Sequence, residues 1–209
     1  MNYLIFDFET VGIDKNNDDG YKPYPIDEKP LPRENYPMEI GLCLIKEDGT
    51  IIKTDKIIIQ GAERVSPWTE QNCHNISVQK CEREGIPFSE TLKKMANMIG
   101  EISCTLVAHN IEYDWDKVLL YTAKEMNLTN SPAFIKLNNC DRYCTCINET
   151  NKKNKSAYFY NKLKKWMGPK LEKLCQRNNI TYDAKSAHDS LYDVEITRQC
   201  FVAEYLKCS

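Results

Sequence analysis

The sequence has no long apolar run and no excess of basic residues. No stretch approaches the ~20 apolar residues of a membrane-spanning helix, and the mean hydropathy is −0.57, which excludes an integral membrane protein. The 28 Lys+Arg are set against 30 Asp+Glu, so the net charge is −2. Proteins that hold nucleic acid by bulk electrostatic attraction are expected to be basic, and the total charge alone argues against that class.

Targeting and repeat signals are also missing. The N-terminus MNYLIFDFET carries two early acids and lacks the basic and apolar regions of a signal peptide. We therefore expect an intracellular protein, cytoplasmic or nuclear, with reduced thiols and no membrane partner. The 209 residues show no internal repeat and fit a single domain over residues 1–209.

Ten cysteines are present, but the pattern that would complete a zinc site is absent. Cys140, Cys144 and Cys146 are closely spaced, yet no second Cys or Cys/His pair follows them. Two interpretations stay open: a zinc-dependent interaction protein built on these three residues, and free cysteines acting as small apolar side chains. The second suits the cysteines in apolar segments, namely Cys43, Cys104, Cys175 and Cys200.

Apolar patterning predicts a mixed α/β sheet with helices on its faces. Strands are expected at 2–8, 38–46, 50–60, 104–108 and 134–138. Helices are expected at 89–101, 111–127, 171–177 and 189–206. The first three strands should form an antiparallel meander, because the Asp-Gly pair at 48–49 favours a tight hairpin turn.

Two segments depart from this pattern. Residues 14–37 contain five prolines and are expected to form a surface insertion. A Lys-rich segment covers about 151–168, and residues 151–177 carry eight lysines and one arginine against one glutamate, a net charge of +8. The other 182 residues therefore carry −2 − 8 = −10. The near-neutral total hides a basic region and no longer argues against a nucleic-acid partner.

The basic region also contains aromatic residues, which can stack on unpaired bases while lysines neutralise phosphates. The residues expected to contact substrate there are Lys162, Lys164, Lys165 and Trp166. The alternative is a solvated loop whose aromatic side chains pack on the domain.

Acidic residues recur at three places where they can act together. Asp7 and Glu9 are two apart on a predicted strand, so both point to one side, where a divalent cation would compensate them unless both lie in solvent. Asp114 and Asp116 follow His109 on a predicted helix, about 200° apart around its axis, so only one can face a site. The third place is HDSLYD at 188–193.

Together these segments resemble a known family. FDFET (6–10), HNIEYD (109–114) and HDSLYD (188–193) are similar to the three motifs of the DEDDh class of DnaQ-like 3′→5′ exonucleases. Further similarity lies in EIG (39–41), in HNI (74–76) with GIPF (85–88), and in LEKLC (171–175). Asn75 stands where glycine is usual. The resemblance covers nearly the whole chain except the insertion and the Lys-rich segment.

The resemblance implies a ribonuclease-H-like fold: a mixed five-stranded sheet with three antiparallel N-terminal strands and helices on both faces. It also implies two Mg²⁺ or Mn²⁺ ions, one held by Asp7, Glu9 and Asp193, the other by Asp7 with Asp114 acting through waters. Asp114 is thereby selected over Asp116. Two cations about 4 Å apart would stabilise the attacking and leaving oxygens of an in-line displacement at phosphorus.

A general base is still needed, and its best pKa lies near neutrality. Of the three histidines, we assign His188, because a loop position lets it reach the attacking water, and expect His109 to be structural. Thr10 would contact the 3′-terminal nucleotide or cap the strand end. Asn110 would brace the backbone or the substrate.

The predicted function is 3′→5′ hydrolysis of single-stranded or frayed DNA or RNA, which releases nucleoside 5′-monophosphates. The partner would be a nucleic-acid 3′ end, with a polymerase beside it if the enzyme proofreads. The alternative is an inactive nucleic-acid-binding module of the same fold. Such a module typically lacks one of the five motif residues, and here all five are present.

Overall fold

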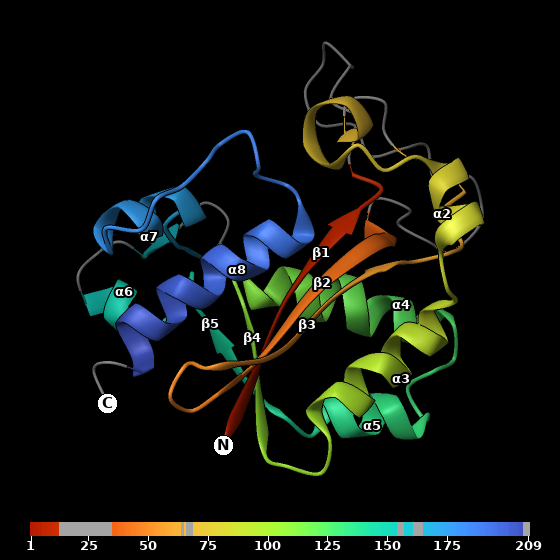
Figure 1. Ribbon diagram of the computed structural model, residues 1–209, viewed down its shortest axis with the longest axis horizontal. Helices are drawn as coiled ribbons and strands as arrows, with labels where there is room; N and C mark the ends of the chain where they lie inside the picture. Colours follow the sequence, from red (N-terminus) through yellow and green to blue (C-terminus); the bar gives the residue numbers. More distant parts are fainter. Residues whose placement is uncertain (13–34, 64, 66–68, 154–156, 161–164, 207–209) are drawn as a thin grey trace.

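The computed structural model describes residues 1–12, 35–63, 65, 69–153, 157–160 and 165–206 (Figure 1). Most of the expected insertion at 14–37 lies outside these residues, as do Lys162 and Lys164. Pro37, the last residue assigned to the insertion, is the first residue of a strand. None of the helices in the described part of the chain combines the length and apolar character needed to cross a membrane.

Five strands form one sheet in the order β3-β2-β1-β4-β5. They are β1 (Asn2–Thr10), β2 (Pro37–Lys46), β3 (Ile51–Ile58), β4 (Cys104–Ala108) and β5 (Asp141–Cys144). The pairs β1–β2 and β2–β3 are antiparallel, whereas β1–β4 and β4–β5 are parallel. The predicted mixed sheet with an antiparallel N-terminal meander is confirmed.

Helices cover both faces of this sheet (Figure 1). One face carries α3 (Phe88–Ile99), the π-helical segment η3 (Glu112–Leu120), α4 (Tyr121–Glu125) and α5 (Pro132–Asn138). The other carries α8 (Ser190–Phe201), against which α7 (Leu171–Arg177) packs. In the described residues the remaining helical elements are η2 (Glu70–His74), α2 (Val78–Glu84), α6 (Glu149–Lys153) and η4 (Val202–Leu206).

Alternation along β1 divides its side chains between two hydrophobic clusters, one on each face of the sheet. Phe6 packs in the cluster that contains Leu92 and Trp115, whereas its neighbour Ile5 packs with Val194 of α8. Successive side chains of a strand point to opposite faces, so β1 is buried on both sides. This double burial fixes the register of the strand that carries Asp7 and Glu9.

The predicted fifth strand at 134–138 is wrong, because those residues lie in α5. The Ser131 side chain accepts a hydrogen bond from the Phe134 amide at 3.2 Å, and Pro132 occupies the first turn, where its missing N–H costs nothing. Phe134 and Leu137 are both buried, at the i, i+3 spacing of one helix face. The fifth strand is β5, whose four side chains are exposed or half-buried and give a weak apolar signal.

A smaller two-stranded sheet lies in the Lys-rich region. It consists of β6 (Tyr158–Tyr160) and β7 (Lys165–Met167), which pair antiparallel. Lys165 and Trp166, two of the expected substrate contacts, belong to β7.

The main sheet splits at the C-terminal end of β1. Pairing of β1 with β4 runs from Asn2 to Ile5, whereas pairing with β2 continues to Thr10. The last residues of β1 therefore extend past β4, and the space beside them is open for side chains from other elements.

Candidate active site

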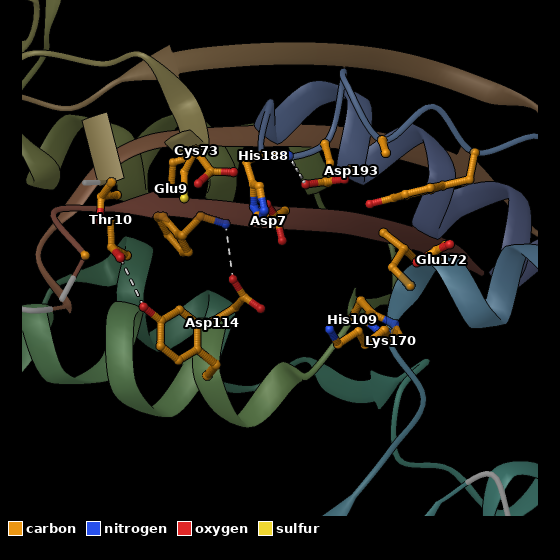
Figure 2. A pocket seen from close by; sticks show the side chains of 18 residues that line it. Asp7, Glu9, Thr10, Cys73, His109, Asp114, Lys170, Glu172, His188 and Asp193 are labelled. Carbon is orange, nitrogen blue, oxygen red and sulfur yellow. Dashed lines mark hydrogen bonds between the residues drawn. The ribbon is translucent and has the colours of Figure 1, made fainter. Parts of the chain in front are cut away.

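The predicted catalytic residues converge where the sheet splits. Asp7 and Glu9 from β1, Asp114 from η3, and His188 and Asp193 from the start of α8 all line one cavity of about 810 Å³ (Figure 2). The neighbouring Asp116 is exposed, whereas Asp114 is 2% exposed. The helical spacing thus separated the two acids correctly.

Backbone amides hold two of these carboxylates in place. The Phe8 amide, which lies beyond the β4 pairing, donates to Asp114 Oδ1 at 3.1 Å, and the His188 amide donates to Asp193 Oδ2 at 2.9 Å (Figure 2). The first bond connects the segments 6–10 and 109–114, and the second lies within the segment 188–193. The five-residue separation in HDSLYD therefore lets the amide of His188, in the loop before α8, reach the carboxylate of Asp193 in the first turn of the helix.

Four acidic side chains share the cavity, and their pKa values are raised. Burial, Asp114 and Glu9 raise the pKa of Asp7 well above its usual range. Burial and then Asp193 raise the pKa of Glu9 to about 9. Burial also raises the pKa of Asp114 to about 7, against the lowering effect of the Phe8 amide, and raises the pKa of Asp193. The four carboxylates repel one another and favour a bound cation.

The donor atoms suit a divalent metal ion. Glu9, His188 and Asp193 each place one ligand atom within 4.8 Å of the others. Asp193 Oδ1 is buried and has no hydrogen-bond partner among the described residues. Buried carboxylate oxygens with unused acceptor capacity are the ligands that hard cations prefer, so these residues fit such an ion.

The three histidines differ in what their rings contact. His74 Nδ1 accepts from the Ile76 amide at 3.1 Å, so its Nε2–H donates to the Thr10 carbonyl at 2.9 Å. His188 lines the cavity, and within the described residues its ring makes no hydrogen bond. The His74 ring is committed to protein partners, whereas the His188 ring is available.

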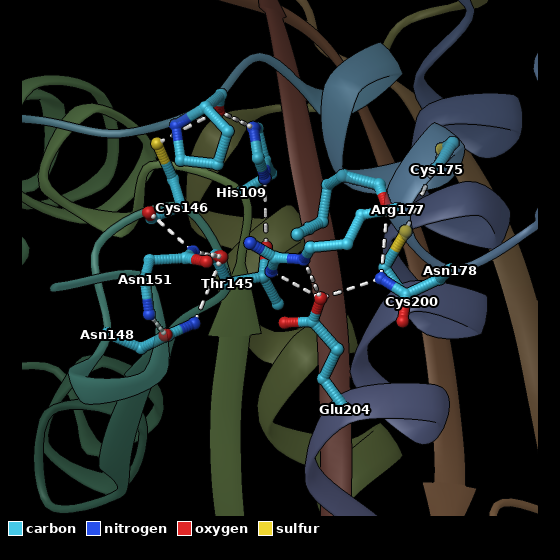
Figure 3. A network of polar contacts seen from close by, with 12 residues as sticks. His109, Thr145, Cys146, Asn148, Asn151, Cys175, Arg177, Asn178, Cys200 and Glu204 are labelled. Carbon is cyan, nitrogen blue, oxygen red and sulfur yellow. Dashed lines mark hydrogen bonds and ion pairs between the residues drawn. The ribbon is translucent and has the colours of Figure 1, made fainter. Parts of the chain in front are cut away.

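His109 is committed in the same way (Figure 3). Its Nε2–H donates to the Pro169 carbonyl at 3.1 Å, and Nδ1 accepts from Thr145 Oγ1 at 3.0 Å. Burial lowers the pKa of His109 to about 4. The neutral ring connects the end of β4 to Thr145, which follows β5, and to Pro169, as expected of a structural histidine.

The expected substrate contacts fall in different places. Thr10 lines the cavity, and its Oγ1 shares a hydrogen bond with the Tyr113 hydroxyl at 3.0 Å (Figure 2). Asn110 does not line this cavity but an adjoining one. Sequence reasoning missed Tyr113 and Lys170 as lining residues, although one adjoins Asp114 and the other belongs to the basic region.

The three closely spaced cysteines do not gather into a site. Cys140 Sγ donates to the Lys136 carbonyl at 3.5 Å, and Cys144 Sγ accepts from the Ile147 amide at 3.2 Å. Cys146 Sγ donates to the carbonyl of Pro169 at 3.5 Å. Within the described ranges, the one group of metal-capable side chains contains no cysteine, so the zinc interpretation finds no support.

Fold and site together define a ribonuclease-H-like protein with a centre of four carboxylates and a histidine. The model of the exonuclease family (RNase T) matches residues 4–201, and the chain belongs to that family. Among curated protein sequences no match is found.

Solved structures show the same fold at low sequence identity. A 3′-exonuclease in a structure of histone mRNA stem-loop recognition is 16% identical, with 100% of this chain and 82% of that one covered and a TM-score of 0.66. E. coli exonuclease I with a dT13 oligonucleotide is 14% identical (99% and 42% covered, TM-score 0.64). Exonuclease I of Methylocaldum szegediense is 16% identical (99% and 41% covered, TM-score 0.64). This chain spans about two fifths of the exonuclease I chains.

Proposed function

We propose that the protein is a 3′→5′ exonuclease that hydrolyses the terminal phosphodiester bond of single-stranded or frayed DNA or RNA and releases nucleoside 5′-monophosphates. The observation that carries the proposal is the convergence of all five motif residues on one cavity. Membership of the exonuclease family supports it. The similar structures were solved with a DNA oligonucleotide and in a study of an mRNA stem-loop, so both substrate classes are retained.

The carboxylates would hold two divalent cations, Mg²⁺ or Mn²⁺. Asp7, Glu9 and Asp193 would hold one, and Asp7 together with Asp114 the other. When bound, such ions stabilise the charge on the attacking and leaving oxygens of a displacement at phosphorus. Without a cation the raised pKa values of Asp7 and Glu9 favour their protonated forms, so loading would be coupled to proton release.

His188 would act as the general base. Its backbone amide is bound to Asp193 while its ring stays available in the cavity. The ring would take a proton from the attacking water, and the nearby carboxylates of Glu9 and Asp193 would stabilise the imidazolium that results. Thr10 would contact the 3′-terminal nucleotide from the end of β1.

The first prediction is that Asp7→Asn abolishes hydrolysis while the fold persists, because the amide cannot compensate a cation as the carboxylate does. The assay uses 5′-labelled single- and double-stranded DNA and RNA oligonucleotides, each with Mg²⁺ or Mn²⁺. Asp116→Asn is the matched control, since it removes an exposed acid from η3 and should leave the rate unchanged.

Excess EDTA should stop hydrolysis by the unaltered protein. Full activity in EDTA, or in the Asp7→Asn variant, would contradict the proposal. Tight oligonucleotide binding without any hydrolysis under all metal conditions would favour the inactive binding module.

A further inference from the structure

A second cavity adjoins the active-site cavity. Its volume is about 410 Å³, and it shares His109, Tyr113 and Lys170 with the larger one. The two cavities are therefore direct neighbours, and the shared side chains of His109, Tyr113 and Lys170 lie between the carboxylates and the second cavity.

One wall of the second cavity is held by hydrogen bonds and a close backbone approach. It is formed by the last residue of β7, Met167, and by Gly168 and Pro169, which follow it. The Pro169 carbonyl accepts hydrogen bonds from both His109 and Cys146 (Figure 3). A Cβ atom on Gly168 would lie 2.3 Å from the Cys146 carbonyl oxygen, so only glycine permits this approach.

The polar groups of the second cavity differ from those of the first. Its lining includes the exposed Lys117 and Lys170 against a single acid, Glu112. It also includes Asn110, whose φ of 78° is unusual for a residue with a side chain. Two ammonium groups and an amide suit a phosphodiester with its base and sugar, whereas the four carboxylates of the first cavity suit cations.

We propose that the second cavity binds the nucleotide on the 5′ side of the scissile phosphate, with Lys117 and Lys170 contacting backbone phosphates and Asn110 hydrogen-bonding the nucleotide. This inference rests on the proposed exonuclease function. β7, which belongs to the Lys-rich segment, leads directly into the lining of the second cavity.

The test compares two substrates for one variant. A single-stranded oligonucleotide occupies both cavities, whereas the p-nitrophenyl ester of thymidine 5′-monophosphate carries nitrophenol in place of the preceding nucleotide. Lys117→Gln is the chosen variant, because Lys117 lines only the second cavity. It should raise KM for the oligonucleotide about threefold to tenfold and leave kcat and ester hydrolysis unchanged.

Salt dependence gives an independent readout. Loss of one phosphate contact should lower the slope of log binding constant against log salt by about 0.7 for a single strand. Lys124→Gln is the matched control, because Lys124 is an exposed lysine of α4 that lines neither cavity. Its KM and slope should equal those of the unaltered protein.

The outcomes separate the two proposals. If Lys117→Gln behaves like Lys124→Gln, or changes both substrates equally, the second cavity does not bind the preceding nucleotide. If the unaltered protein hydrolyses neither substrate with Mg²⁺ or Mn²⁺, the exonuclease function fails. In that case fluorescence anisotropy measures the dissociation constant of a labelled oligonucleotide for Lys117→Gln and for the unaltered protein. Equal dissociation constants would overturn the inference.

Discussion

His188 has a left-handed backbone conformation, with φ 66°. A residue with a side chain adopts this conformation at a cost of about 1–2 kcal/mol. Here the conformation lets the amide reach Asp193 at 2.9 Å while the same residue lines the cavity. A variant of this position therefore has to keep the backbone shape if it is to report on the ring alone.

His188→Asn meets that requirement, because asparagine tolerates left-handed geometry but is not a base. We expect kcat to fall about 10²- to 10⁴-fold while oligonucleotide binding and the midpoint of thermal unfolding stay the same. Steady-state kinetics and anisotropy measure the two effects. A turnover within twofold of the unaltered protein would assign the base elsewhere.

The resemblance of three short motifs to the exonuclease family predicted the five motif positions, but no pattern predicted the partners of the other histidines. Helical periodicity predicted that Asp114 and Asp116 cannot face the same site, since that geometry is local, and the family resemblance selected Asp114. The bonds from His74 to the Thr10 carbonyl and from His109 to the Pro169 carbonyl span 64 and 60 residues. No short pattern encodes such contacts, because they depend on how distant elements pack.

At the scale of elements, the start of α8 is held by the sheet. Lys56 Nζ of β3 lies 2.6 Å from Asp189 Oδ2 and 3.2 Å from Glu39 Oε1. Ser190 Oγ donates to Glu39 Oε1 at 2.7 Å. A Cβ atom on Gly41 would lie 2.3 Å from the Ser190 carbonyl oxygen, so β2 and α8 meet closely only because of that glycine. The loop with His188 is thus anchored from two strands.

Lys56→Met should lower kcat about tenfold with little change in KM, because Asp189 loses its partner and His188 beside it is less well positioned. Lys56→Arg should restore most of the rate, since it keeps the charge. Lys53→Met is the control on the same strand, where the lysine is exposed. Equal rates for the Lys53 and Lys56 variants would show that the ion pairs do not position the base.

Elements with strong periodicity could be predicted, whereas the short α5, β6 and β7 could not. The helix at 171–177 matches α7 residue for residue, and the hairpin at Asp48-Gly49 joins β2 to β3. The apolar residues of α5 predict a strand, whereas Ser131 and Pro132 before them are the signal of a helix start. β6 and β7 have three residues each, too few for any period to appear.

At the scale of the whole molecule, His109 couples folding to pH. The pKa of the His109 ring is near 6.5 in the unfolded chain and about 4 in the folded protein. Between these values the unfolded state holds more protons, so His109 makes stability fall as the pH is lowered. The expected loss between pH 7 and pH 5 is about 2 kcal/mol.

Urea unfolding at both pH values measures this loss. His109→Gln has no titrating ring at this position, so its stability should decline about 2 kcal/mol less over the same interval, even if its absolute stability is lower. Parallel pH profiles for the two proteins would mean that the folded state accepts the proton on His109.

Cation binding should also stabilise the fold. A divalent ion at one hundred times its dissociation constant adds about 2.7 kcal/mol, which thermal unfolding in Mn²⁺ and in EDTA measures. Asp193→Asn should lose most of this increment, because it removes a carboxylate that faces Glu9. Asp116→Asn should keep it. An equal increment in both variants would place the cation away from Asp193.

The split between β1 and β4 supplies a built-in reporter. The Phe8 amide donates to the Asp114 carboxylate and not to a neighbouring strand. Its rate of hydrogen exchange therefore depends on the orientation of the Asp114 side chain. A ligand that draws Asp114 away would make this amide exchange faster, while amides in the paired part of β1, such as Ile5, stay protected. One proton in the sheet thus records the state of the catalytic centre.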